Sequence, residues 1–440
     1  MPSVPASPIP RRAVASWVLY DLANTIFSMG VVSLYFSFYV GDAVSATDTD
    51  IVYGAIQAVS MGLIFVLSPL LGAMTDRARR RMPFLVWSTL ICCACTALMA
   101  RGGFAVSAAL FILANAAYQA GLQFYDALLP EVSTEENRGY VGGIGVGVGY
   151  LGSYLAVALG FFFPADAHAA IFTSIAVAFL LFALPCFYFV RERGNPNPRP
   201  VFGWRVVRES TRETLATLRS SRGYPGLLRF LVGRVFYTDA INTVIAYMAL
   251  YATGVSMAGG LTEAEGQNQA RLVMLAAISF AVVGGFVWGR LADRLGPKRT
   301  LTWVLRLWLV TFTLASLTGL LRLPIAMLYL VGILAGIALG GTWAADRPYM
   351  LRLTPPHRVG EFYGLYGMVG RFSAVTGPVL WVAVMTVSVK WLGLAVLTGQ
   401  GLAIATLLGM IVVSMRILAP VTDDRRDWAR LAAAGDGPRP

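Results

Sequence analysis

Apolar runs of about 20 residues recur along the whole sequence, and they limit what the chain can fold into. A helix rises 1.5 Å per residue, so a run of that length crosses the ~30 Å hydrocarbon core of a bilayer. The 440 residues are 57% hydrophobic and only 13% charged, whereas a soluble domain usually carries about 25% charged residues. The sequence therefore predicts an all-α integral membrane protein.

We predict twelve transmembrane helices from these runs. They lie at about residues 13–40, 52–74, 83–101, 104–129, 140–163, 169–190, 227–253, 271–291, 300–321, 325–347, 361–387 and 391–416. The one long polar break falls between the sixth and seventh runs. The predicted domains are an N-terminal six-helix bundle (1–190), a cytoplasmic linker (191–226), a C-terminal six-helix bundle (227–416) and a cytoplasmic tail (417–440).

The basic residues have an asymmetric distribution. The net charge is +12, and Lys and Arg concentrate in alternate connecting segments, such as "DRARRR" at 76–81 and the nine arginines between Arg191 and Arg229. Cytoplasmic loops of membrane proteins are enriched in Lys and Arg. We therefore expect both termini in the cytoplasm. The charge pattern favours membrane topology over nucleic-acid binding.

The linker contains a segment with helical amphipathicity, "GWRVVRESTRETLATLRS". Its apolar positions include Trp204, Val207 and Leu215, and its other positions are rich in arginine. Basic amphipathic helices of this type lie in the membrane interface. The sequence therefore predicts a helix on the inner leaflet.

Three motifs occur once in each half of the chain at nearly the same offset. "YDLANT" and "TDAINT" share D-x-x-N-T, "GAMTDR" and "GRLADR" share G-x-x-x-D-R, and an aspartate precedes an arginine by 12 residues in both halves. The members are Asp21, Asn24 and Thr25 with Asp239, Asn242 and Thr243; Gly72, Asp76 and Arg77 with Gly289, Asp293 and Arg294; and Asp126 and Arg138 with Asp346 and Arg358. Parallel six-helix repeats of this kind build the major facilitator transporters.

The motifs also resemble known families. G-x-x-x-D-R followed by basic residues resembles the major facilitator signature loop, and here it occurs in both halves. "YDLANTIFS", "FYDALLPEVS", "GYLGSY", "FYTDAINT" and "GEFYGLYGMVGRFSAVTGP" resemble the autophagy-related vacuolar effluxer permease family and its bacterial members. This resemblance implies two pseudo-symmetric six-helix bundles, amino-acid efflux and a location in a bacterial inner membrane. "MTDRARRRMPFL" and "ALLPEV" also resemble the glycoside–cation symporters, which leaves the substrate class open.

Charged residues within the predicted spans mark a candidate binding site. The helical rise puts Asp21, Asp239 and Arg371 near the bilayer midplane, where each charge costs at least ~2.5 kcal/mol. The predicted substrate or proton site consists of Asp21, Asn24, Asp239, Asn242, Arg371 and Arg234. We expect the two Asp–Asn pairs to meet across a central cavity and Arg371 to bind a substrate carboxylate. The alternative is a permanent ion pair between one of these aspartates and Arg234 or Arg371.

The signature loops and the acids near spans four and ten are predicted to form gates at the cytoplasmic face. Asp126 is expected to reach Arg80 or Arg81, and Asp346 to reach Lys298 or Arg299. Such pairs would break as the halves rock; the alternative is a passive topology role. The predicted gate residues are Gly72, Asp76, Arg77, Arg80, Arg81, Asp126, Gly289, Asp293, Arg294, Lys298, Arg299 and Asp346.

These features favour a secondary transporter of a small polar solute, an amino acid or related zwitterion, that works as a monomer. A proton or sodium ion is the expected coupling ion, with no other cofactor, because the sequence has no P-loop. The sequence shows no pairing of a nucleophile with a base that would indicate an enzyme, and no metal site is expected. A cation-coupled sugar carrier, with Tyr20, Tyr247, Trp343 and Tyr349 as aromatic platforms, a lysolipid carrier, and a receptor or scaffold are the alternatives.

Overall fold

The computed structural model describes residues 10–134, 138–164, 166–195, 198–201, 203–221, 224, 226–354 and 359–422. Helices account for most of this part of the chain, and it contains no strand. The predicted all-α fold class is therefore confirmed. Each of the twelve predicted ranges overlaps a helix.

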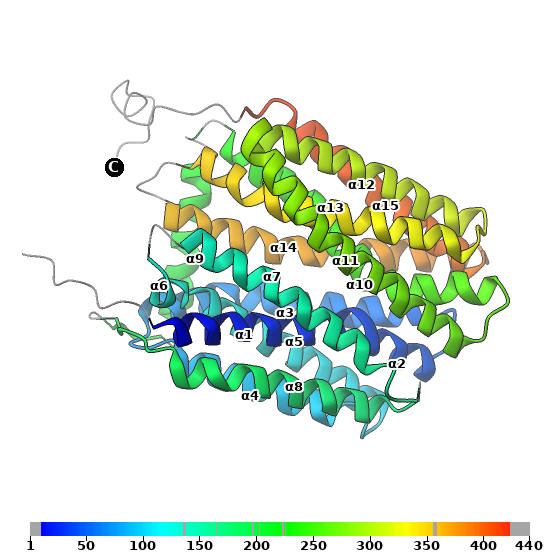
Figure 1. The fold of residues 1–440 in the computed structure, drawn as a ribbon, viewed down its shortest axis with the longest axis horizontal. Coiled ribbons are helices and arrows are strands. Elements are labelled where there is room, and N and C mark those ends of the chain that lie inside the picture. The colour runs from blue at the N-terminus through cyan, green and yellow to red at the C-terminus, as the bar shows by residue number, and fades with distance from the viewer. Residues whose placement is uncertain are drawn as a thin grey trace, which may run out of the picture. The chain divides into compact units, whose positions relative to one another are not determined.

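The chain divides into two compact units (Figure 1). Unit 1 (Met1–Phe36 and Pro69–Val207) contains α1 (Arg11–Phe27), η1 (Ser28–Tyr35), α4 (Met82–Leu98), α5 (Phe104–Asp126), α6 (Leu129–Val132), α7 (Arg138–Leu159) and α8 (His168–Phe189). Unit 2 (Ser37–Ser68 and Arg208–Pro440) contains α10 (Leu227–Ala258), α11 (Glu263–Leu295), α12 (Pro297–Leu320), α13 (Ile325–Leu353), α14 (Val359–Met385), η4 (Thr386–Trp391) and α15 (Val396–Leu418).

Three helices contain residues of both units: α2 (Phe36–Ala43), α3 (Thr49–Arg77) and α9 (Trp204–Ser220). Residues 37–68, which come early in the sequence, thus pack within unit 2. The π-helix η1 continues α1 directly into α2 and ends one residue before this change of unit. The amphipathic segment of the linker is helical, as predicted, and Trp204 and Leu215 are exposed on it.

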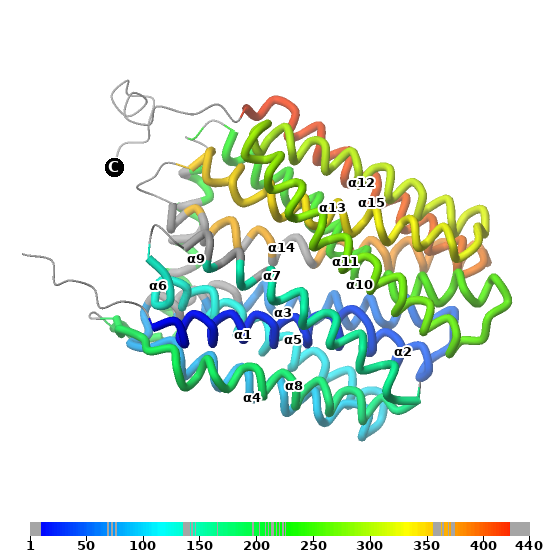
Figure 2. Tube along the Cα trace, viewed as in Figure 1, coloured from blue at the N-terminus to red at the C-terminus, as the bar shows by residue number. Residues whose placement is uncertain are grey.

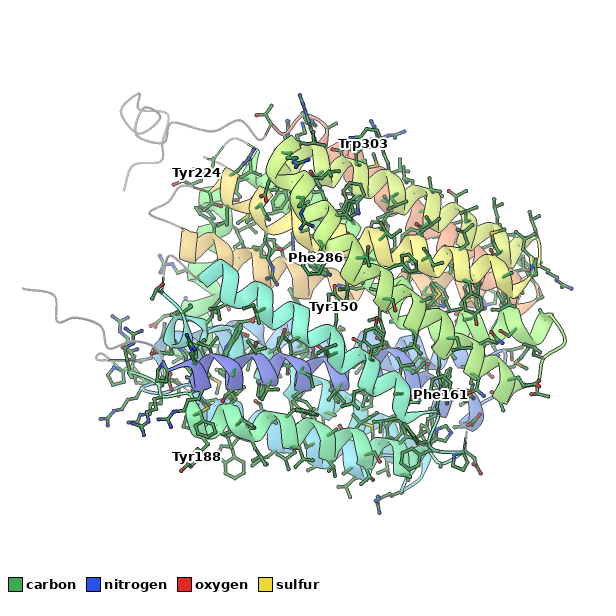
Figure 3. The ribbon with its side chains drawn as sticks, viewed as in Figure 1. Tyr150, Phe161, Tyr188, Tyr224, Phe286 and Trp303 are labelled. Atoms are coloured by element: carbon green, nitrogen blue, oxygen red, sulfur yellow. The ribbon has the colours of Figure 1, made fainter. Side chains whose placement is uncertain are left out.

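The described helices have the length and composition of membrane spans. Nine of those within the described residues are long and apolar enough to cross a bilayer, and Met82–Leu98, Gly147–Leu159 and Val375–Trp391 are shorter apolar helices. Several carry large apolar side chains on their outer surface. Tyr188, Phe286 and Trp303 are more than half exposed, and Figure 3 shows Tyr188 pointing away from α8. Such surfaces suit contact with lipid.

In unit 1, α1 packs against α7 and α8 (Figure 1). Gly152 of α7 allows this close approach, because a Cβ there would overlap the carbonyl oxygen of Leu22. The Trp17 ring stacks on Tyr125 with centroids 4.5 Å apart, and the Tyr20 and Thr89 hydroxyls are 2.6 Å apart. These contacts fix the face of α1 that carries Asp21.

In unit 2, α11 and α13 lie side by side (Figure 2). A Cβ at Gly336 would overlap the carbonyl oxygen of Ala277, and one at Gly340 would overlap that of Ala281. Gly336 and Gly340 are four residues apart in the tenth predicted span. This small-xxx-small spacing lets two helix backbones approach closely, as it does in other membrane proteins. The N-terminus of α11 is fixed by a capping box between Thr262 and Glu265.

We expect Gly336→Ala to lower stability by roughly 1–3 kcal/mol, because the added methyl group forces α11 and α13 apart. The thermal midpoint of the purified protein in detergent measures this. Gly409→Ala is the matched control, since no atom lies within 4 Å of a Cβ at that position. Equal midpoints for the two variants would show that close approach of these helices does not limit stability.

Candidate functional site

In unit 2, the D-x-x-N-T motif of α10 packs against a glycine of α14. Asp239 is fully buried, and its Oδ1 accepts a hydrogen bond from the Gly377 backbone N–H at 2.9 Å. A Cβ at Gly377 would overlap Thr243 Oγ1, one turn after Asp239. Only glycine therefore lets the α14 backbone reach this carboxylate. Asn242 is half-buried on the same helix.

The polar atoms of this motif are incompletely satisfied. Thr376 places a side-chain donor beside the Asp239 carboxylate, but Asp239 Oδ2 and Thr243 Oγ1 are buried without a hydrogen bond of normal geometry within the described residues. An unpaired buried polar group costs about 1–3 kcal/mol, and more when it is charged. These two atoms can therefore bind a donor other than those that the described residues supply.

In unit 1, the first copy of the motif packs against α7 in the same way. A Cβ at Gly149 would lie 3.0 Å from Asp21 Oδ2 and 3.1 Å from Thr25 Oγ1. Both polar atoms of the Asn24 side chain are buried without a hydrogen-bond partner in the described part of the chain. The repeated sequence thus forms a repeated local structure, in which aspartate and threonine one turn apart enclose a glycine.

A buried charge cluster lies elsewhere in unit 2. The Arg234 Nε donates to Asp346 Oδ2 at 3.0 Å, and both side chains are at most 5% exposed. Asp346 also accepts hydrogen bonds from the hydroxyls of Tyr237 and Tyr366. The Arg234 guanidinium lies 3.7 Å from the Tyr366 ring centroid and donates through Nη1 to the Tyr366 carbonyl oxygen. The cluster therefore provides partners for both charges.

This cluster corrects two predictions. Asp346 was expected to pair with Lys298 or Arg299 in a cytoplasmic gate, but it binds Arg234, and Lys298 donates to the carbonyl oxygen of Ala419 at 2.9 Å. The alternative in which Arg234 is the permanent partner of Asp239 is also wrong, because Arg234 pairs with Asp346. Asp346 lies seven residues before the end of α13, or about 10 Å inside it, so it faces buried groups rather than the surface loop.

The corresponding loop of unit 1 contacts the end of α5. Arg81 Nη1 donates to the carbonyl oxygen of Ala127 at 2.8 Å, one residue after Asp126, which is exposed at the end of the helix. The backbone N–H of Arg81 donates to both carboxylate oxygens of Glu192 at 2.8 Å. The start of the linker is thereby attached to this loop.

The other predicted gate residues lie at or near the surface. Arg77 and Gly289 are half-buried, and Arg80, Asp293, Arg294 and Arg299 are exposed. The side chains at Gly72, Asp76 and Arg371 lie outside the described residues. The gating role of this set stays a prediction, as does the role of Arg371 as a carboxylate clamp.

Sequence reasoning missed a further polar cluster, around Asp50 at the start of α3. Asp50 is 2% exposed and accepts hydrogen bonds from Trp381 of α14 and Gln400 of α15. Tyr53 and Gln57 follow on the same face of α3, at positions i+3 and i+7. That polar stripe at helical spacing is the signal in the sequence that could have indicated a buried site.

Residues 44–390 match the family described as Vacuole effluxer Atg22 like. The chain belongs to this family. It is 25% identical over 376 residues to the MFS-type transporter YxiO of Bacillus subtilis, covering 81% of this chain and 84% of that protein. Autophagy-related protein 22-1 of Aspergillus niger is 26% identical over 252 residues, which cover 52% of this chain and 39% of that protein.

Solved structures show the same fold. The nucleoside transporter NupG (TM-score 0.69, 14% identity) matches 93% of this chain and 99% of its own. The human organic anion transporter MFSD10 (TM-score 0.61, 17% identity) matches 94% and 100%. The fold is therefore that of major facilitator transporters. With the family match, these findings make the chain an integral membrane transporter of the MFS type and not an enzyme.

We expect Asp346→Asn to lower the free energy of unfolding by ~3–5 kcal/mol, because it leaves the Arg234 guanidinium buried without its counter-charge. Thermal midpoints in detergent measure the loss. Arg234→Gln combined with Asp346→Asn removes both charges and should restore much of the stability. A double variant no more stable than Asp346→Asn would contradict the pairing account.

Proposed function

We propose that this transporter moves a small polar solute, an amino acid or a related zwitterion, by alternating access. The observation that carries this proposal is the buried Asp239 carboxylate. Its Oδ1 accepts a hydrogen bond from the Gly377 N–H, whereas its Oδ2 has no hydrogen bond of normal geometry among the described residues. The family is described as a vacuole effluxer, which suits export of such a solute. We place the protein in a bacterial inner membrane, as a monomer with both termini cytoplasmic.

A substrate ammonium group fits the needs of Asp239. It has three N–H donors and a positive charge, so it can supply both a hydrogen bond and a counter-charge to Oδ2. Thr243 Oγ1, buried and without a hydrogen bond among the described residues, can accept a second N–H. Charges inside membrane proteins usually belong to substrate or ion pathways, which supports a working role for this carboxylate.

The substrate carboxylate requires a different cation. Arg234 is already bound to Asp346, so its charge is neutralised within the protein. We therefore assign the carboxylate to Arg371, whose guanidinium can bind it through two parallel hydrogen bonds. In unit 1, the buried Asn24 amide can both donate and accept hydrogen bonds, and its part in substrate binding stays a prediction.

The sugar alternative has less support. Sugar carriers need free aromatic faces, but Tyr20 stacks on Tyr125 at 5.0 Å and Tyr247 stacks on Trp381 at 4.1 Å. Tyr349 contacts Phe230 edge-on and donates its hydroxyl to the chain. Three of the four predicted platforms thus make contacts inside the protein.

Solute exchange in proteoliposomes tests the proposed function. Vesicles loaded with unlabelled solute should take up the same solute in labelled form, and a screen covers amino acids, sugars and lysolipids. We expect exchange with an amino acid or another zwitterion. Exchange confined to sugars or lysolipids would overturn the substrate class.

We expect Asp239→Asn to abolish exchange of the amino acid, because the substrate amine loses its counter-charge, while the fold stays intact. Exchange rate and thermal midpoint are measured together. Asp166→Asn is the control, since Asp166 is exposed in the loop before α8. Exchange at the wild-type rate in Asp239→Asn would remove Asp239 from the binding site.

A further inference from the structure

The carboxylate of Asp50 is buried inside unit 2, and its side-chain hydrogen-bond donors among the described residues are neutral. Its Oδ1 accepts from the indole Nε1 of Trp381 at 3.0 Å, and its Oδ2 accepts from Gln400 Nε2 at 2.9 Å. All three side chains are at most 2% exposed. None of these partners carries a positive charge.

Aromatic side chains close the space around this carboxylate. Tyr247 stacks on Trp381 at 4.1 Å, and Tyr53 meets Tyr247 edge-on at 5.2 Å. The Tyr53 hydroxyl donates to the carbonyl oxygen of Ala246 and accepts from Gln57 Nε2. These rings are fully buried, so they separate Asp50 from water.

The charged groups on neighbouring elements have other partners. Lys390 of η4 pairs with Asp48, and this hydrogen bond lowers the pKa of Asp48. Glu263 of α11 interacts with Asp42 of α2.

Another charged side chain on a neighbouring element, Arg271 of α11, donates to the side-chain oxygen of Asn268. Tyr53 and Tyr247, which interact electrostatically with Asp50, are neutral hydroxyls. No ion pair of Asp50 occurs among the described residues.

An isolated charge in such a setting is costly, because neither water nor a cation compensates it. The adjacent amide is also incomplete, since Gln400 Oε1 is buried without a hydrogen-bond partner within the described chain. Its oxygen and nitrogen belong to one planar group whose orientation depends on the hydrogen-bond network. If Asp50 is protonated and the Gln400 side-chain amide rotates by half a turn, the Asp50 O–H donates a hydrogen bond to Gln400 Oε1. A sodium ion between the two oxygens would satisfy the same pair.

The position of Asp50 in the chain links cation binding to the packing of α3 on α14 and α15. Residues 37–68 pack within unit 2, but the sequence on both sides of them belongs to unit 1. Wherever α3 separates from α14 and α15, Asp50 loses Trp381 and Gln400 and gains water. A cation bound at Asp50 therefore favours the packed arrangement, by its differential affinity for the two states.

We propose that Asp50 is the binding site of the coupling cation, a proton or a sodium ion, held while the start of α3 packs on Trp381 and Gln400. The inference rests on the proposed function, since coupling has meaning only for a transporter. It separates two carboxylates by role: Asp239 binds the substrate amine, and Asp50 binds the ion that drives accumulation.

Transport driven by an ion gradient tests the proposal. The membrane voltage is held at zero. Under this condition, cotransport of one proton or sodium ion per substrate molecule sustains about tenfold accumulation of substrate from a tenfold ion gradient, since each factor of ten in concentration is ~1.4 kcal/mol. We expect Asp50→Asn to equalise the substrate on the two sides while exchange continues near the wild-type rate. Asp48→Asn, which removes an exposed carboxylate two residues away, should accumulate like the wild type.

The outcomes separate the two proposals. No exchange of any solute by the wild-type protein would contradict the proposed function. If Asp50→Asn exchanges the substrate and also accumulates it as the wild type does, the role of Asp50 is overturned and the proposed function stands. Gln400→Leu is the second variant, because it removes the oxygen that completes the site, and it should weaken accumulation more than exchange.

Direct ion binding gives a test that needs no substrate. Infrared difference spectra of the purified protein in lipid, recorded across a pH titration, should show a protonated-carboxyl band that is absent from Asp50→Asn and present in Asp48→Asn. Loss of that band on adding sodium, with radioactive sodium bound by wild type and not by Asp50→Asn, would assign the site to sodium. Identical spectra and no sodium binding in both proteins would overturn the proposal.

Discussion

A polar group inside hydrocarbon has no water to bind, and most features of this molecule follow from that constraint. Helices satisfy their own backbone hydrogen bonds, so the apolar runs fold as helices. Side chains must then find partners on neighbouring helices. Asp346 does so completely with Arg234 and two tyrosine hydroxyls. Among the described residues, Asp239 and Gln400 find partners only in part and the Asn24 side chain finds none, so a ligand that supplies the missing hydrogen bonds would bind most favourably there.

The elements of the fold were predictable because their physical signal is local. About 20 apolar residues suffice to mark each run, and every predicted range overlaps a helix. The count of twelve spans stays a prediction, since nine described helices meet the length and composition of a span. The packing of residues 37–68 within unit 2 was not visible in the sequence, because it depends on contacts such as Asp50 with Trp381, 331 residues apart.

The candidate site was predictable only where the sequence repeats. Asp21 and Asp239 were found because D-x-x-N-T occurs twice, but their glycine neighbours have no side chain to signal a contact. The true partner of Asp346 was missed because sequence spacing suggested a surface loop, whereas its depth within α13 favours a buried partner. Asp50 was missed because it precedes the predicted start of its span by two residues, where an aspartate resembles an ordinary loop acid.

The first part of the linker is structurally a portion of unit 1. Glu192 accepts hydrogen bonds from the backbone at Arg81 and Met82, where α4 begins. The backbone N–H groups of Asn195 and Arg199 then donate to carbonyl oxygens of the 77–79 segment. This part of the predicted linker therefore belongs to unit 1, which extends to Val207. A protein engineer who splits the chain or inserts an epitope should leave the segment from Glu192 to Arg199 intact, because its hydrogen bonds help to complete the fold of unit 1.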